Sequence, residues 1–66
     1  MIGLEIKELL YQQRKTQTWL AKQCGVTKGH ISQIISGKSQ PSIKLLKRIS
    51  ESLLVNIDSF FKDNVF

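Results

Sequence analysis

Side chains that can hydrogen-bond to nucleic-acid bases lie close together near the middle of this 66-residue chain. Lys28 can donate to O6 and N7 of guanine, and Gln33 can pair with N6 and N7 of adenine. Thr27 and His30 lie beside Lys28 and also carry hydrogen-bonding groups. On a helix Gln33 would lie about one turn beyond the first three. This spacing predicts a helix tip that reads base edges.

The stretch around these residues contains no negative charge. Between residues 9 and 50 the sequence has eight Lys and Arg and no Asp or Glu, and all five acidic residues lie outside it. The formal net charge of the whole chain is +5. Basic charge by itself can serve solubility, but this clustering favours a polyanionic partner.

The composition argues against several other classes of protein. The only histidine, His30, has no acidic partner nearby in sequence, and no carboxylate pair or phosphate-cradling glycine loop appears, so we expect no enzyme and no cofactor. His30 and Cys24 are too few ligands for zinc, and we interpret the lone Cys24 as a small buried hydrophobic residue. Without a disulfide pair, a signal peptide or an apolar run near 18 residues, we expect a cytoplasmic protein with no membrane contact.

Helices are expected to position these side chains. Apolar spacing predicts helices over residues 2–13, 17–24, 28–36, 42–53 and 57–62. Thr16 and Thr27 are suitable N-caps, while Gly25 and Gly37 can end helices in the left-handed conformation. Ile43 is expected to point inward from the fourth helix. Because no alternating run predicts a strand, we expect an all-α fold with a single domain over residues 1–66.

Two Thr-capped helices joined at Gly25 match the helix-turn-helix unit, whose second helix enters the major groove. At this point the chain resembles the lambda-repressor-like, Cro/C1-type (XRE-type) DNA-binding domains of bacteria and phages. The resemblance covers about residues 2–61 and implies a compact five-helix domain. It rests on Thr16-Gln17, Leu20-Ala21, Gly25-Val26-Thr27, Ile31-Ser32, Ile34, Gly37, Pro41-Ser42, Leu53, Val55, Ile57 and Phe60-Phe61.

The resemblance implies a site for double-stranded DNA. The expected base-reading residues are Lys28, Gly29, Gln33, Thr27 and His30. The expected phosphate contacts are Gln17, Thr16, Thr18, Ser32, Lys38, Ser39, Gln40 and Lys44. Within this set, residues 38–40 resemble a loop whose backbone N–H groups meet the sugar–phosphate chain. Affinity would come mainly from phosphate contacts and base choice from the second helix.

The chain departs from the family pattern at several positions. Leu10 and Ile35 replace an Arg and a Glu that form a buried ion pair in many members, an exchange that is often neutral or stabilising. Arg14 begins an Arg-Lys pair where a Gly-apolar pair is common, so the first corner is expected to differ. Leu54 lies where the family often has Gly, so a left-handed backbone there would be strained. Gly29 supplies no side chain where a base is often read.

The apolar end of the chain predicts a second contact surface. Some of its residues must close the core, and the rest would be exposed in a monomer, where exposed apolar patches often mark partner sites. We expect a homodimer whose two recognition helices lie one DNA turn apart, about 34–36 Å, on a nearly palindromic operator. The residues expected in this interface are Ile57, Phe60, Phe61, Val65 and Phe66.

The sequence thus predicts a sequence-specific transcriptional regulator, with a repressor favoured and a protein antagonist as a further partner. The alternative is an antitoxin or protein-interaction adaptor that uses the same domain with a protein partner. Single-stranded RNA is disfavoured because the basic face lacks stacking aromatics. Trp19 is expected to pack half-buried against the first helix, with a stacking contact or a phosphate contact from its indole N–H as the alternative. Lys47 and Arg48 are expected on a solvated face.

Overall fold

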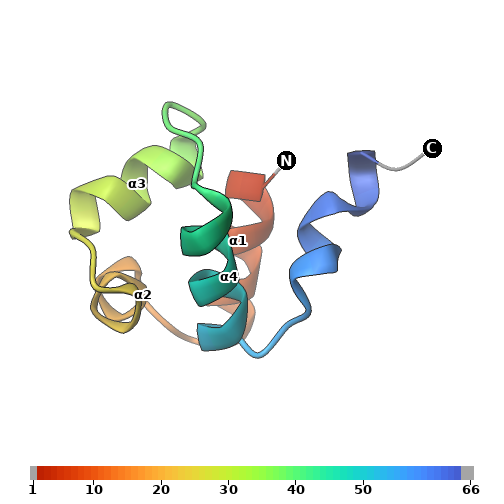
Figure 1. Ribbon diagram of the computed structural model, residues 1–66. Coiled ribbons are helices and arrows are strands. Elements are labelled where there is room, and N and C mark those ends of the chain that lie inside the picture. Colours follow the sequence, from red (N-terminus) through yellow and green to blue (C-terminus); the bar gives the residue numbers. More distant parts are fainter. Residues whose placement is uncertain (1, 65–66) are drawn as a thin grey trace.

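The computed structural model describes the backbone of residues 2–64 and the side chains of residues 2–60. Its elements are α1 (Ile2–Gln12), α2 (Gln17–Cys24), α3 (Lys28–Ser36), α4 (Ile43–Ser52) and the 3-10 helix η1 (Ile57–Asn64) (Figure 1). No strand occurs between residues 2 and 64, so the all-α prediction is confirmed. The fifth element is a 3-10 helix, which corrects the expectation of five α-helices.

Side-chain caps and glycines set the helix ends. The hydroxyls of Thr16, Thr27 and Ser42 accept hydrogen bonds from the backbone N–H three residues later, at 3.0, 3.1 and 3.1 Å. Each such cap contributes about 1 kcal/mol. Gly25 and Gly37 end α2 and α3 with φ of 71° and 84°, a conformation that glycine adopts without strain. The predicted caps and stops of both helices are therefore confirmed.

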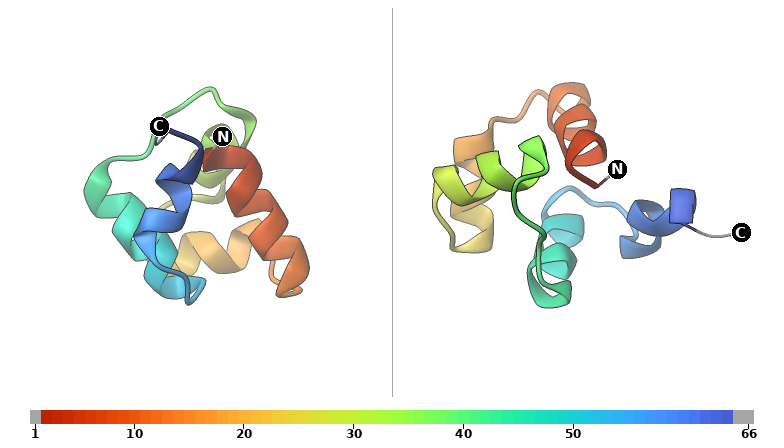
Figure 2. Two further views of the ribbon diagram at one scale, coloured as in Figure 1. Left: turned by 90° about the vertical axis from the view of Figure 1, so that its right-hand side faces the viewer. Right: turned by 90° about the horizontal axis from the view of Figure 1, so that it is seen from above.

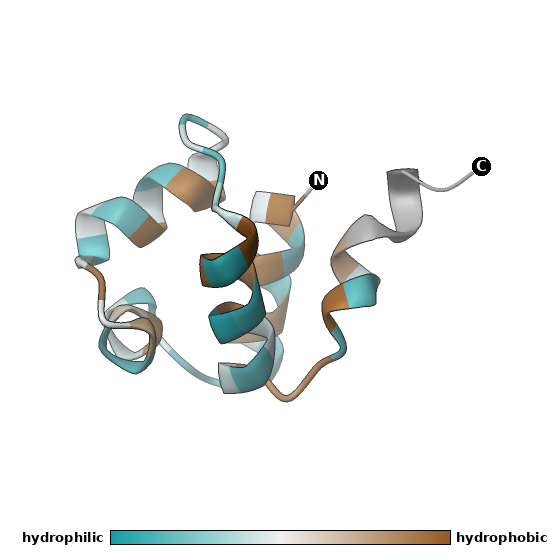
Figure 3. Ribbon diagram, in the orientation of Figure 1, coloured by the Kyte–Doolittle hydropathy of each residue, from teal (hydrophilic) through white to brown (hydrophobic). Residues whose placement is uncertain are grey.

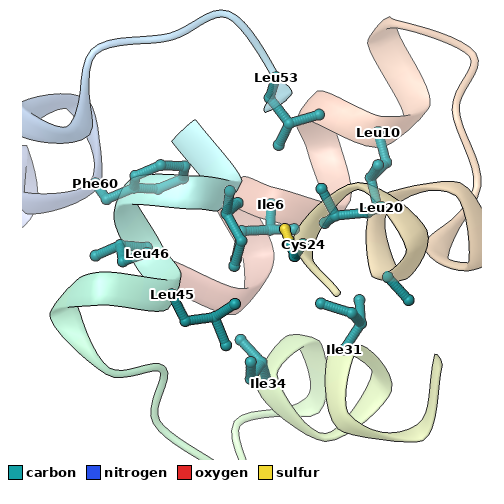
Figure 4. Packing of buried hydrophobic residues seen from close by; sticks show 12 residues of the cluster. Ile6, Leu10, Leu20, Cys24, Ile31, Ile34, Leu45, Leu46, Leu53 and Phe60 are labelled. Carbon is teal, nitrogen blue, oxygen red and sulfur yellow. The ribbon is translucent and has the colours of Figure 1, made fainter. Parts of the chain in front are cut away.

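The helices surround one apolar core. Viewed from the side, η1 lies between α4 and α1 and packs against both (Figure 2). Hydrophobic and hydrophilic stretches alternate along the helices (Figure 3). The buried cluster, drawn in Figure 4, comprises Ile6, Leu10, Leu20, Ala21, Cys24, Ile31, Ile34, Leu45, Leu46, Ile49, Leu53 and Phe60.

Two apolar side chains differ from the expectation in how far they are buried. Ile43 is 67% exposed, so the expectation that it points inward is wrong. It is the first residue of α4, and the buried stripe of this helix begins instead at Leu45 and Leu46. Phe60 is only 1% exposed, because η1 lays its ring against the core between α1 and α4. The prediction that Phe60 forms a dimer contact is therefore wrong.

The start of α1 lies directly against the end of α3. A Cβ atom on Gly3 would lie 2.5 Å from the carbonyl oxygens of both Ile34 and Ile35. Backbone atoms cannot yield to such a contact as a flexible side chain can, so only glycine permits this approach. Nearby, Leu10 is buried and Ile35 packs partly buried against the core, in the apolar environment expected for this pair.

Two residues other than glycine adopt the left-handed conformation, Arg14 with φ of 58° and Leu54 with φ of 59°. The strain expected at Leu54 is present, and a left-handed non-glycine residue costs roughly 1–2 kcal/mol. Next to Leu54, the side-chain amide of Gln13 donates a 2.7 Å hydrogen bond to the carbonyl of Leu53. This bond joins the end of α1 to the end of α4 and helps to hold the strained turn.

The two glycines inside helices predict opposite effects of alanine. Gly3→Ala should destabilise the protein by about 1–3 kcal/mol, because the new methyl group meets backbone. Gly29→Ala should stabilise it by up to about 1 kcal/mol, because the new methyl group would meet only the Thr27 hydroxyl at 4.0 Å and alanine favours helix. Urea unfolding followed by far-ultraviolet circular dichroism measures both. Changes of the same sign would contradict this account of the contact between α1 and α3.

Candidate nucleic-acid interface

The beginning of α3 is an exposed polar tip. Thr27, Lys28, Gly29 and Gln33 are exposed and His30 is half-buried. The helix is held in place by packing of its inner side against the core, where the apolar side chains of Ile31 and Ile34 are 1% and 2% exposed. The structure therefore brings the five predicted base-reading residues to one accessible end of a rigidly packed helix.

The beginning of α2 adds a second group of polar atoms. The Ser32 hydroxyl of α3 donates a hydrogen bond to Oε1 of Gln17, the first residue of α2, at 2.5 Å. This bond uses the oxygen end of the amide and leaves its NH₂ group as the donor for another molecule. Ser32 was expected to touch phosphate itself, whereas here its hydroxyl orients Gln17. No local pattern in the sequence predicts this pairing between two helices.

The cap threonines remain able to donate. The hydroxyls of Thr16 and Thr27 each accept a hydrogen bond from a backbone N–H inside the protein. A hydroxyl that accepts still has its own hydrogen to donate. Thr16, Thr18 and Thr27 are all exposed. Each of them can thus offer a hydrogen to an anionic oxygen without loss of the cap.

The loop after α3 differs from the expectation. The backbone N–H groups of Lys38 and Ser39 both donate to the carbonyl of Gln33, at 2.9 and 3.2 Å. These two N–H groups are therefore already used, which corrects the expectation that the backbone of residues 38–40 as a whole meets the sugar–phosphate chain. The exposed side chains of Lys38 and Gln40 remain accessible on this loop.

The basic residues of α4 have different roles. Lys44 and Lys47 are exposed. Arg48 donates from its guanidinium to the carbonyl of Cys24, at 3.3 Å. A cation suits the C-terminal end of α2, where the helix dipole is negative. Arg48 is exposed, as expected, and its guanidinium in addition joins α4 to the end of α2.

Cys24 is a structural residue. It is 1% exposed, and burial raises the pKa of its thiol, although a hydrogen bond with Ser52 and the charge of Arg48 act in the opposite direction. A buried thiol that resists ionisation is a poor nucleophile. The interpretation of Cys24 as a small hydrophobic core residue is confirmed by its place in the cluster.

Trp19 is half-buried, as expected, and packs against the core cluster, whereas its expected packing against α1 stays a prediction. The Lys15 ammonium lies 4.9 Å from the centre of its ring, which is a cation–π distance. This pair was not predicted, although a spacing of four residues is a usable signal for it. A phosphate contact by the indole N–H stays a prediction.

Two of the five residues expected to form a dimer surface, Ile57 and Phe60, have described side chains, and neither is exposed. Phe60 is buried, and Ile57 is half-buried against the same core. The side chains of Phe61, Val65 and Phe66 lie outside the described residues.

None of the helices between residues 2 and 64 is long and apolar enough to cross a bilayer. No group of three or more metal-ligating side chains occurs among the side chains described.

Comparison with known proteins gives one family and two similar structures. Residues 6–60 match the model of the HTH_3 family, described as helix-turn-helix. A structure of the SinR protein/SinI protein complex is 29% identical with a TM-score of 0.87, over 97% of this chain and 63% of that chain. The crystal structure of Bacillus thuringiensis PlcR in complex with the peptide PapR7 and DNA is 28% identical in sequence with a TM-score of 0.87. This match covers 98% of this chain and 23% of that chain. The chain thus spans less than two thirds of either solved chain. No curated protein matches it.

The bond between Ser32 and Gln17 predicts a linked pair of variants. Ser32→Ala should weaken binding to every duplex by about threefold to tenfold, because the Gln17 amide loses its orientation. Gln17→Ala should weaken it at least as much. The double variant should bind no more weakly than Gln17→Ala, since both act through one contact. Fluorescence anisotropy with labelled duplexes measures all three affinities, and additive losses would refute the linkage.

Proposed function

The chain belongs to the HTH_3 helix-turn-helix family of DNA-binding transcription regulators, and from this premise we propose that it is a sequence-specific repressor that binds a nearly palindromic operator as a homodimer. The proposal is supported above all by the exposed tip of α3, held from behind by Ile31 and Ile34. A helix fixed in this way can enter the major groove with its first residues leading.

Base choice is assigned to the side chains at this tip. Lys28 donates to guanine and Gln33 pairs with adenine, because both side chains are exposed and of suitable chemistry. Thr27 and His30 assist from beside them. Gly29 leaves bare backbone at the same end, so the base opposite it is read by neighbouring side chains or through water.

Affinity is assigned to phosphate contacts by two groups of residues. The first group precedes α3 in the chain and comprises Thr16, Thr18 and the oriented amide of Gln17, and the second follows α3 and comprises Lys38, Gln40 and Lys44. Ser39 is half-buried with its N–H already bonded, so its contribution is limited to its hydroxyl. The absence of acidic residues between positions 9 and 50 spares this surface repulsion from the duplex.

A second candidate function is that of an adaptor or antitoxin that works through a protein partner. One similar structure is a complex of SinR with SinI, and the other contains the peptide PapR7 as well as DNA. These partners belong to those proteins. A stable heteromer of this chain that forms without DNA, with no preference among duplexes, would favour the adaptor over the repressor.

Selection of bound duplexes from a random pool tests the operator proposal. The expected result is a two-fold symmetric consensus whose half-sites lie one helical turn apart. A consensus without symmetry would refute the palindromic dimer but leave DNA recognition standing. Recovery of random sequences would refute specific recognition.

Two variants separate base reading from phosphate binding. Gln33→Ala should cost about 1–3 kcal/mol on the selected sequence and relax one base position, because it removes a base-edge contact. Lys38→Ala should weaken binding to all sequences alike. It should also reduce, by about one, the slope of the logarithm of the binding constant against the logarithm of the salt concentration. Competition of selected and scrambled duplexes at several salt concentrations measures both effects. Equal losses on both duplexes for Gln33→Ala would overturn its assignment.

A further inference from the structure

The outer side of α1 carries apolar residues that the fold leaves uncovered. Leu4 is 53% exposed and Tyr11 is 85% exposed, although both are large. Together with Lys7, Glu8 and Gln12 they line a hollow of about 380 Å³ on the surface of this one helix. Core contacts are made from the opposite side of α1 by Ile6 and Leu10. The outer face, defined by Leu4, Lys7, Glu8, Tyr11 and Gln12, is thus unused by the fold.

We propose that this outer face of α1 binds the outer face of α1 in a second copy of the chain, with the two helices antiparallel. In a two-fold symmetric contact each residue pair occurs twice, once in each direction. A two-fold axis that passes between positions 7 and 8 places Leu4 opposite Tyr11 and Lys7 opposite Glu8. The order of residues along α1 is therefore complementary to itself when it is reversed.

The charges on the outer face of α1 favour a second copy of the chain as its binding partner. Lys7 and Glu8 are both exposed and differ in sign, so each meets its opposite on the second copy in this arrangement. The largely exposed Tyr11 ring of one copy would enter the hollow beside Leu4 of the other. A burial of this kind removes both exposed apolar side chains from water, and an aromatic ring contributes most to such contacts.

The outer face of α1 is separate from the recognition tip. Figure 2 shows α1 and the beginning of α3 on different sides of the molecule when it is seen from above. Self-association through α1 therefore leaves Lys28 and Gln33 accessible. The proposal does not rest on DNA binding. In this arrangement α1, and not the buried Phe60, forms the contact between two copies of the chain.

The association is expected to be weak. A stable interface uses about 20–30 residues on each side, whereas this hollow is lined by five. We expect a dissociation constant of roughly 10 μM to 1 mM. Two copies held near each other on one duplex would meet at a much higher effective concentration, where a contact of this strength is sufficient.

Charge reversal tests the pairing directly by sedimentation equilibrium without DNA. Lys7→Glu alone and Glu8→Lys alone should each weaken self-association about tenfold, because each places like charges opposite one another at two symmetric points. An equimolar mixture of the two variants should associate as well as the unchanged chain, because every pair is again of opposite sign. The double variant Lys7→Glu/Glu8→Lys should also recover.

Control variants keep the test independent of folding and of DNA binding. Tyr11→Ser should abolish association, whereas Ile43→Ser, which removes an exposed apolar residue on α4, should leave it unchanged. Circular dichroism verifies that each variant is folded, and affinity for a duplex with a single half-site reports DNA binding separately. A chain that stays monomeric at 1 mM, or a mixture that does not recover association, would overturn the proposal.

Discussion

The recognition surface depends on the burial of two isoleucines. Ile31 and Ile34 anchor α3 in the core, so the polar side of the same helix has to face outward. A helix of nine residues would not be stable in water by itself, and most of its order comes from this packing. The exposed tip, the loop after it and the position of α1 all follow from the depth at which α3 is held.

Polar bonds between helices then fix the details that packing leaves open. The hydroxyl of Ser32 orients the amide of Gln17, which joins α3 to α2. Arg48 joins α4 to the carbonyl end of α2. Apolar contacts are tolerant of small rotations, whereas hydrogen bonds require a definite direction. The helix-turn-helix unit is therefore held by directional bonds from both sides, which suits a surface that has to match a rigid duplex.

Local signals in the sequence predicted the helices well, because caps and glycine stops act over three or four residues. Thr16, Thr27, Gly25 and Gly37 fall where they were expected. Contacts between distant residues were not predictable from such signals. The burial of Phe60 depends on how η1 lies over α1 and α4, and the contacts of Arg48 and Ser32 link residues 24 and 15 positions apart. Among the site residues, the chemistry of each was readable, but its partner within the protein was not.

The two bonds from the loop to the carbonyl of Gln33 have an evolutionary consequence. They tie the loop to the backbone of a residue whose side chain is exposed. Any amino acid at position 33 supplies the same carbonyl, so the loop keeps its shape whichever side chain is present. Under the proposed assignment of Gln33 to a base, preference for a new target sequence can thus arise by single exchanges at this position, without compensating changes in the scaffold.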